Sequence, residues 1–274
     1  MDLNSRVGKA YLEDLQAHGM LRRNRQMLRS AFLLPLALLA AAPDAAAQLG
    51  DNQRIESSAL GYALHYRVYV PPAVSEPAGL PSLYVFDGQW YIEQGFPAVL
   101  DSLIGAGRMR PTVAVFIDNR NPDFLRENRR NRQFFCNPKY ESFVADELVP
   151  AVDAAHPTHA ARESRAVIGL SFGGLAAACM GLHERDTFGN IAMQSPATHP
   201  VRSLHTDYLG IEQLPLRVFL SSGDHQDNEQ ATRRFRDILS GRVLDLHYVE
   251  VPFAHNWANW GPLLDDAALF LFGN

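Results

Sequence analysis

The five residues Gly169-Leu170-Ser171-Phe172-Gly173 place a serine where it can act as a nucleophile. They follow an apolar run of strand type, AVIG, and lead into an alanine-rich run that favours a helix. A strand, a G-x-S-x-G turn and a helix in this order form the nucleophile elbow, which exposes the serine hydroxyl on a sharp turn. Free N–H groups at the start of the helix, that of Phe172 first, would stabilise a negatively charged oxygen. Ser171 is therefore the predicted nucleophile.

A serine hydroxyl is a weak nucleophile until a base takes its proton, and in folds that carry this elbow the order along the chain is serine, acid, histidine. Only His255 lies in the expected place, after the last apolar run of strand type and before the final helical pattern. The loop after the preceding strand contains Asp224, Asp227 and Glu229. We expect Asp227 to orient His255, because the acid usually lies a few residues past the strand end; Asp224 is the alternative and Glu229 a distant third.

A second oxyanion donor is expected after the strand of residues 82–86, where the sequence continues as DGQW. Gly88 would let the backbone approach a substrate closely, so we expect the donor to be the backbone N–H of Gly88 or Gln89. Three tryptophans are candidates for the wall of an aromatic pocket, although tryptophans beside a loop are as often plain packing: Trp90, Trp257 and Trp260.

Apolar runs of strand length alternate with helical patterns along the chain. The expected strands cover residues 64–70, 82–86, 112–117, 165–169, 190–194, 216–222 and 244–251. Several are apolar on both faces, which is typical of parallel strands covered by helices on each side. Helical patterns cover residues 232–239 and 263–270 and join Tyr140, Val144, Leu148 and Val152 on one face, and Pro150 should kink that helix. The sequence predicts one α/β sandwich with a mostly parallel sheet.

The longest irregular stretch covers residues 118–138 and is rich in Asn, Arg and Pro. Long loops in compact domains tend to be functional, but a run of arginines is equally typical of a solvated surface. The cysteines are Cys136, in this stretch, and Cys179, within an alanine-rich helix. Because Cys179 has the setting of a small buried hydrophobic residue, we expect no disulfide.

Residues 1–47 have the pattern of a secretory signal peptide. An apolar run at residues 31–42 follows several arginines and precedes the small residues Ala45-Ala46-Ala47. The run is shorter than the roughly 20 residues of a membrane span, so we expect no stable membrane insertion after cleavage. Met20 and Met27 are alternative starts. The expected mature domain is residues 48–274, secreted across the inner membrane to the periplasm.

Composition excludes other classes of function. The chain has 25 basic and 30 acidic side chains and a net charge of -5, so it has no cationic surface of the kind that holds a nucleic-acid backbone. His156 and His159 form an H-x-x-H pair without a nearby acidic third ligand. We therefore expect no metal, no organic cofactor and no nucleic-acid partner.

The chain resembles the putative-esterase branch of the α/β-hydrolases, the group that contains enterochelin esterase, esterase D and the mycolyl transferases. The likeness covers nearly all of residues 62–272. It rests on Asp87-Gly88-Gln89-Trp90, on FVADELVP at 143–150, on GLSFGG at 169–174, on Phe188-Gly189 before Gln194-Ser195-Pro196, and on HNWANW at 255–260. The resemblance implies an α/β-hydrolase three-layer sandwich, with Ser171 as nucleophile and His255 as base. The chain departs from the family pattern at two positions. Ala254 replaces the usual glycine before the histidine, and Gln226 occupies the place where siderophore esterases tend to have their acid.

These observations together predict a serine esterase that hydrolyses a small-molecule carboxylic ester through an acyl-enzyme. If the likeness to enterochelin esterase extends to the substrate, this would be an anionic trilactone siderophore bound by arginines of the irregular stretch, among them Arg129 and Arg132. One alternative is an acyltransferase of the mycolyl-transferase type. Another is a non-catalytic periplasmic binding protein on a hydrolase scaffold, which the presence of both Ser171 and His255 disfavours.

Overall fold

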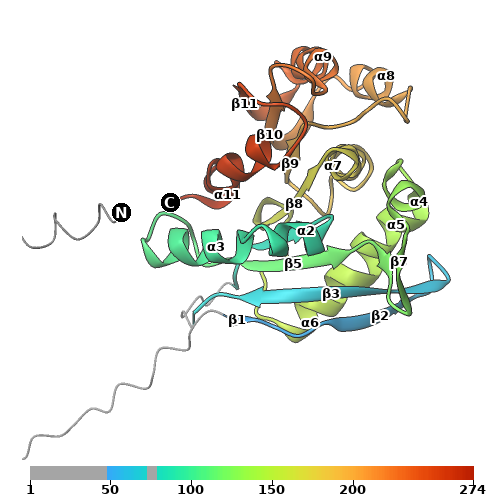
Figure 1. Cartoon of the computed structure of the whole chain (residues 1–274), viewed down its shortest axis with the longest axis vertical. Coiled ribbons are helices and arrows are strands. Elements are labelled where there is room, and N and C mark those ends of the chain that lie inside the picture. The colour runs from blue at the N-terminus through green and yellow to red at the C-terminus, as the bar shows by residue number, and fades with distance from the viewer. Residues whose placement is uncertain (1–47, 73–78) are drawn as a thin grey trace, which may run out of the picture. The chain divides into compact units, whose positions relative to one another are not determined.

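The computed structural model describes residues 48–72 and 79–274, so the predicted signal peptide lies outside the described residues. A sheet with the strand order β1-β3-β5-β4-β8-β9-β10-β11, with β2 added on β3, forms its centre (Figure 1). The strands are β1 (Gln48–Leu49), β2 (Gln53–Ser57), β3 (Tyr62–Val70), β4 (Ser82–Val85), β5 (Val113–Asp118), β8 (Arg165–Leu170), β9 (Asn190–Gln194), β10 (Leu214–Gly223) and β11 (Val243–Val251). From β5 to β11 all pairs are parallel, whereas β1, β2 and β5 pair with β3 in antiparallel fashion. The predicted mostly parallel sheet is confirmed.

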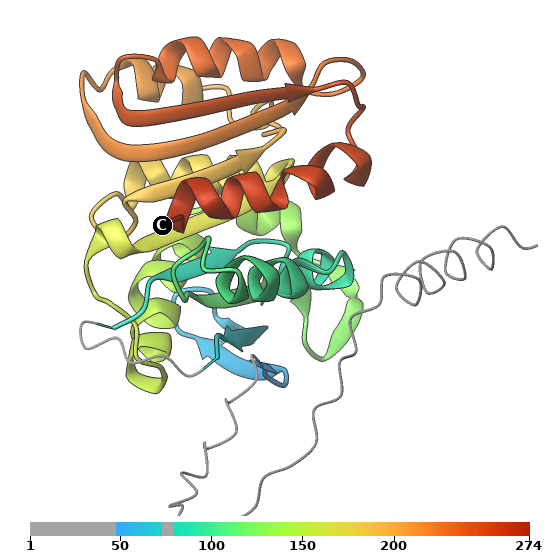
Figure 2. The ribbon, with the colours of Figure 1, turned by 90° about the vertical axis from the view of Figure 1, so that its left-hand side faces the viewer.

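Helices cover both faces of this sheet. One face packs against α2 (Gly88–Glu93), α3 (Phe96–Gly105), α10 (Trp257–Trp260), η3 (Gly261–Leu263) and α11 (Leu264–Phe272), and Figure 2 looks onto α3 and α11. The other packs against α5 (Pro138–Ser142), η1 (Phe143–Leu148), α6 (Val149–Ala155), α7 (Phe172–His183), α8 (Leu204–Leu209) and α9 (Glu229–Leu239). In β5, Val113, Val115 and Ile117 join one core, whereas Ala114 and Phe116 join the other. The structure is the predicted three-layer sandwich.

The expected distortion at Pro150 lies one turn earlier. The chain runs as a π-helix through η1 and returns to α-helix at Val149. Proline cannot donate a hydrogen bond, and its ring crowds the carbonyl four residues back, so the wider π turn accommodates it. The four residues predicted to share a face are all buried: Tyr140, Val144, Leu148 and Val152.

Within the described residues, no helix is both long and apolar enough to cross a membrane.

Residues 118–138, expected to be irregular, contain regular structure. A hairpin of β6 (Arg120–Asn121) and β7 (Phe124–Asn128) leads into the short helix α4 (Arg130–Phe134). The side chain of Asn121 caps the turn by accepting from the N–H of Asp123 at 3.0 Å, and Arg54 of β2 pairs with Asp123. Polar contacts therefore hold the hairpin, and such contacts leave no periodic pattern of apolar residues in the sequence.

The prediction of unpaired cysteines is wrong, because Cys136 and Cys179 form a disulfide with their Cα atoms 5.2 Å apart. Cys136 lies between α4 and α5 with a φ of 46°, and Cys179 lies fully buried in α7. The sequence placed Cys179 correctly inside a helix but did not show that the α4–α5 turn packs directly on it. The bond joins the helix that follows Ser171 to the segment that contains α4.

Removing this disulfide should destabilise the fold. A bond between residues 43 apart in sequence restricts the unfolded chain, which corresponds to about 4 kcal/mol in the chain-entropy relation. We expect the double variant Cys136→Ala/Cys179→Ala to lose stability of this order in urea unfolding. A phosphine reductant should destabilise the wild type similarly and leave the double variant unchanged. Equal unfolding midpoints for oxidised and reduced wild type would contradict the prediction.

Candidate active site

The predicted nucleophile lies on a strained turn between a strand and a helix. Ser171 separates β8, which ends at Leu170, from α7, which begins at Phe172, and its φ is 54°. A non-glycine residue in such a conformation is costly and is found mostly at functional sites. A Cβ on Gly169 would lie 2.3 Å from the backbone of Gly173, so the turn can close only because residue 169 is glycine. The turn places Ser171 at the carboxyl edge of the parallel strands.

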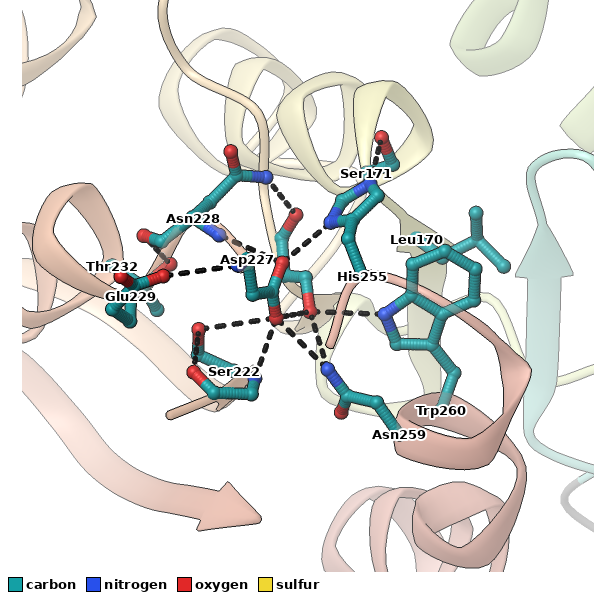
Figure 3. A network of polar contacts seen from close by, with 12 residues as sticks. Leu170, Ser171, Ser222, Asp227, Asn228, Glu229, Thr232, His255, Asn259 and Trp260 are labelled. Carbon is teal, nitrogen blue, oxygen red and sulfur yellow. Dashed lines mark hydrogen bonds and ion pairs between the residues drawn. The ribbon is translucent and has the colours of Figure 1, made fainter. Parts of the chain in front are cut away.

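A histidine and a carboxylate from two other loops meet this serine. His255, on the loop between β11 and α10, has its Nε2 2.9 Å from the Oγ of Ser171. Its Nδ1 lies 2.5 Å from Oδ1 of Asp227, on the loop after β10 (Figure 3). The backbone N–H of His255 also donates to the carbonyl of Gln226 at 3.2 Å, which ties the two loops together. His255 is therefore placed to accept the proton of Ser171, and Asp227 is placed to orient His255.

Asp227 is held by hydrogen bonds on both carboxylate oxygens. Besides His255, it accepts from the Ser195 hydroxyl at 2.6 Å, the Gly223 N–H at 2.5 Å, the Asn228 N–H at 2.7 Å and the Asn259 amide at 2.8 Å. Burial alone would raise the pKa of Asp227, but the hydrogen bonds from His255, Ser195 and the backbone outweigh it and lower the pKa to about 2. Asp227 therefore remains an anion that can orient His255.

This shift in pKa makes Asp227 a contributor to acid stability. Because its pKa falls from an ordinary 3.8 to about 2, the carboxylate stabilises the folded chain by roughly 2 kcal/mol above about pH 4. The contribution is lost as the pH falls through the folded-state pKa. We expect the stability gap between wild type and Asp227→Asn in urea unfolding to be constant from about pH 6 to pH 4 and to narrow by about pH 3. A gap that stays constant at the lowest pH would contradict this.

The other two carboxylates of the loop point elsewhere. Oδ1 of Asp224 lies 2.5 Å from Nδ1 of His225, and both side chains are exposed. Oε2 of Glu229 accepts from the backbone N–H of Asp227 at 3.1 Å, so it supports the loop. Of the three candidates, the structure brings Asp227 to His255.

The residues expected to donate to an oxyanion lie at the first turns of two helices. Phe172 begins α7, and Gly88 and Gln89 begin α2. The first N–H groups of a helix have no acceptor within it, so they are free to bind a negatively charged oxygen. A Cβ on Gly88 would lie 2.5 Å from the backbone of Ile117, so this position needs glycine for the close crossing of β5. Both turns follow parallel strands at the edge that bears Ser171.

A cavity of about 460 Å³ opens beside Ser171 and His255. Its other lining residues are Trp90, Glu93, Arg130, Leu170, Trp257 and Trp260. All three tryptophans singled out from the sequence are among them. Trp260 also packs edge-on against the His255 ring, with ring centres 4.9 Å apart, and donates through its indole N–H to Ser195 at 2.9 Å. The cavity has the aromatic walls that suit a planar substrate group.

The arginine in this cavity is Arg130, which belongs to the same irregular stretch as Arg129 and Arg132, the two expected to bind substrate. Arg129 instead lies over the ring of Tyr62 at 4.4 Å and donates to Glu127, and Arg132 lies over the same ring at 4.8 Å. The cavity lining includes neither of them. Three arginines so close in sequence are distinguished only by the direction in which the backbone at the start of α4 points each side chain.

One group of side chains among the described residues brings metal-ligand types close together. Atoms of Cys136, Cys179 and Glu141 lie within 4.8 Å of one another, but both sulfurs are part of the disulfide. His159, considered above as a metal ligand, accepts from the N–H of Ala161 at 3.0 Å.

Comparison with known sequences gives one family. The family model described as "Putative esterase" matches residues 57–271. The chain is 34% identical over 129 residues to iron(III) enterobactin esterase of Dickeya dadantii, a match that covers 47% of the chain and 28% of that protein. It is 24% identical over 198 residues to the endo-1,4-beta-xylanase/feruloyl esterase of Xylanibacter ruminicola. This match covers 70% of the chain and 26% of that protein. The chain thus matches about a quarter of the length of each of these two relatives.

Solved structures share the fold. The enterobactin esterase of Shigella flexneri, crystallised in the presence of enterobactin, matches 84% of the chain and 59% of its own length with a TM-score of 0.74 at 23% identity. A ferulic acid esterase matches 84% of the chain and 99% of its own length with a TM-score of 0.68 at 18% identity.

Proposed function

The chain belongs to the putative-esterase family, and from this premise we propose that it is a serine esterase that forms an acyl-enzyme on Ser171. The single observation that carries the proposal is the continuous set of contacts from Asp227 through His255 to Ser171, at 2.5 and 2.9 Å, beside an open cavity. A site that only bound a ligand would need neither a strained serine nor a histidine oriented by a buried carboxylate.

The geometry supports the following steps. His255 Nε2 takes the proton of Ser171 as its Oγ attacks the ester carbonyl, and the N–H of Phe172, with that of Gly88 or Gln89, stabilises the oxyanion. The C–O bond to the alcohol then breaks, and His255 returns the proton to the leaving oxygen. Water attacks the acyl-enzyme with His255 again as base, which releases the acid and restores the serine. Asp227 stays ionised and stabilises the positive charge on His255.

The cavity favours an ester with an aromatic group close to the scissile bond. Trp90, Trp257 and Trp260 provide the aromatic surface, and the guanidinium group of Arg130 forms part of the wall. The enterobactin and feruloyl esterase names of the relatives agree with an aromatic substrate. A trilactone siderophore is our first candidate. Because Asp87 largely neutralises Arg130, this arginine adds little net positive charge to the cavity with which to attract an anionic siderophore.

A panel of esters tests this function. We expect the protein to hydrolyse enterobactin and a feruloyl ester faster than a simple aliphatic ester, with kcat/KM as the measure. Hydrolysis of aryl esters without enterobactin cleavage would contradict the siderophore substrate, and turnover of none of them would contradict the esterase. An added alcohol acceptor should leave the free acid as the main product; a new ester as the main product would indicate an acyltransferase instead.

We also propose that residues 1–47 direct export. The disulfide between Cys136 and Cys179 supports an oxidising compartment, where such bonds persist. N-terminal sequencing of the protein recovered from periplasmic and cytosolic fractions tests this, and a periplasmic form that begins near residue 48 is expected. A cytosolic form that retains the segment would contradict it.

A further inference from the structure

Arg130 connects the two turns that frame the nucleophile. Its Nε donates to both carboxylate oxygens of Asp87, at 2.8 and 2.9 Å. Its Nη2 donates to the carbonyl of Leu170, the residue before Ser171, at 3.0 Å. One guanidinium group thus binds the turn after β4 and the end of β8 at the same time. This bridge is additional to the contacts among Ser171, His255 and Asp227.

Asp87 is built into the first of these turns. It directly precedes Gly88 and Gln89, has a φ of 54° and is fully buried. Its Oδ1 also accepts from the side-chain amide of Asn119, and a Cβ on Gly173 would lie 2.9 Å from its Oδ2. The carboxylate therefore packs directly against the first turn of α7. A displacement of Asp87 would move the backbone that carries one expected oxyanion donor relative to Phe172, which carries the other.

Aromatic rings hold the guanidinium group in place. The ring centres of Trp90 and Phe172 each lie 5.1 Å from the guanidinium carbon of Arg130, and that of Phe134 lies at 5.8 Å. Trp90 belongs to α2, and Phe172 begins α7, so these contacts join the same two elements as the hydrogen bonds do. The Arg130 side chain is only 12% exposed. Partial exclusion of water strengthens such charge-assisted contacts.

We infer that Arg130 is a positioning residue that, through Asp87 and Leu170, holds the two oxyanion-donor turns in register with Ser171. This inference rests on the proposed esterase function. Catalysis by preorganised donors requires that both turns keep their geometry during the reaction, and a shift of about 1 Å can cost about 100-fold in rate. In this role Arg130 fixes the backbone positions of the two turns. It affects substrate binding only through the shape of the cavity.

The test compares variants of this pair with a matched ion pair at the other end of β8. Arg130→Met removes the bridge, Asp87→Asn keeps a side chain that tolerates positive φ, and the double variant removes both charges. Arg165→Met is the control. Arg165 begins β8, is 10% exposed, pairs with Asp153 at 2.5 Å and donates to the carbonyl of Ala160, so it matches Arg130 in burial and bonding. Each variant is assayed for kcat and KM on one aryl ester and for unfolding in urea.

We expect Arg130→Met and Asp87→Asn each to lower kcat by about 100-fold with KM changed less than about threefold, because donor geometry matters mainly in the transition state. The double variant should be no slower than the slower single variant, because the two residues act as one unit. Arg165→Met should lose stability and keep kcat within about threefold of wild type. A merely structural Arg130 would behave as Arg165 does.

Other results overturn the inference. Wild-type kcat in folded Arg130→Met, or a raised KM with unchanged kcat, would show that Arg130 does not position the turns. If Arg130→Met does not fold, Asp87→Asn and Arg130→Lys test the inference in its place, since both keep a polar side chain in the site. A wild-type kcat in both of these variants would overturn the inference. Failure of the esterase function itself would be distinct, because the wild type would then turn over no ester in the same assay.

Discussion

Ser171→Ala should reduce kcat for ester hydrolysis by about 10⁶-fold, because the nucleophile, base and acid act as one unit and the loss of the nucleophile removes the covalent route. The residual rate would come from the oxyanion donors and the cavity, which the substitution leaves in place. Alanine removes one hydroxyl oxygen, so substrate affinity should stay close to that of the wild type. Steady-state rates and a binding titration of the inactive variant measure the two effects.

Ser82→Ala is a suitable control for this experiment. Ser82 is also a buried serine, but it is the first residue of the central parallel strand β4, so it lies at the edge of the sheet opposite to Ser171. Its hydroxyl has no hydrogen-bond partner among the described residues, so the substitution should leave kcat near the wild-type value. Retention of more than a small fraction of activity in Ser171→Ala would show that the reaction does not use this serine.

Asp227→Asn should reduce kcat by about 10⁴-fold, since an amide cannot hold His255 in the tautomer that accepts the serine proton. The effect should be severe because the groups around Asp227, His255 included, donate hydrogen bonds to it, so an amide nitrogen in place of either oxygen would face a donor. The kcat at pH near 7 measures it.

Asp224→Asn distinguishes this assignment from its closest alternative. Asp224 is exposed and pairs with His225, so its substitution should leave kcat within about threefold of wild type, as is usual for surface changes. A large loss in Asp224→Asn together with a small one in Asp227→Asn would reverse the roles of the two residues.

The strands and helices that build the sheet could be predicted because burial leaves a pattern in the sequence. β8 and β9 are buried at every residue, and their inner residues, 166–170 and 191–193, form uninterrupted apolar runs. β2 and the β6–β7 hairpin were missed because most of their side chains are exposed, so their residues carry no periodic apolar signal. The disulfide was missed because it depends on the turn between α4 and α5 packing against α7, across a separation of 43 residues.

The site was predictable where a local motif fixes it and ambiguous where tertiary contacts decide. A Cβ on Gly169 would meet the backbone of Gly173, and a Cβ on Gly173 would meet the carboxylate of Asp87, so glycines at both positions leave a sequence signature. Asp224 and Asp227 are alike in sequence, and only the donors that surround Asp227 select it. In the same way Arg130 differs from Arg129 and Arg132 only through its partners Asp87 and Leu170.

The most direct test of an acyl-enzyme on Ser171 is to treat the protein with a fluorophosphonate and to map the adduct by mass spectrometry. We expect one adduct per chain, located on Ser171, with parallel loss of esterase activity and no adduct in Ser171→Ala. Wild-type protein that hydrolyses esters but is not labelled, or that is labelled at another residue, would contradict the assignment.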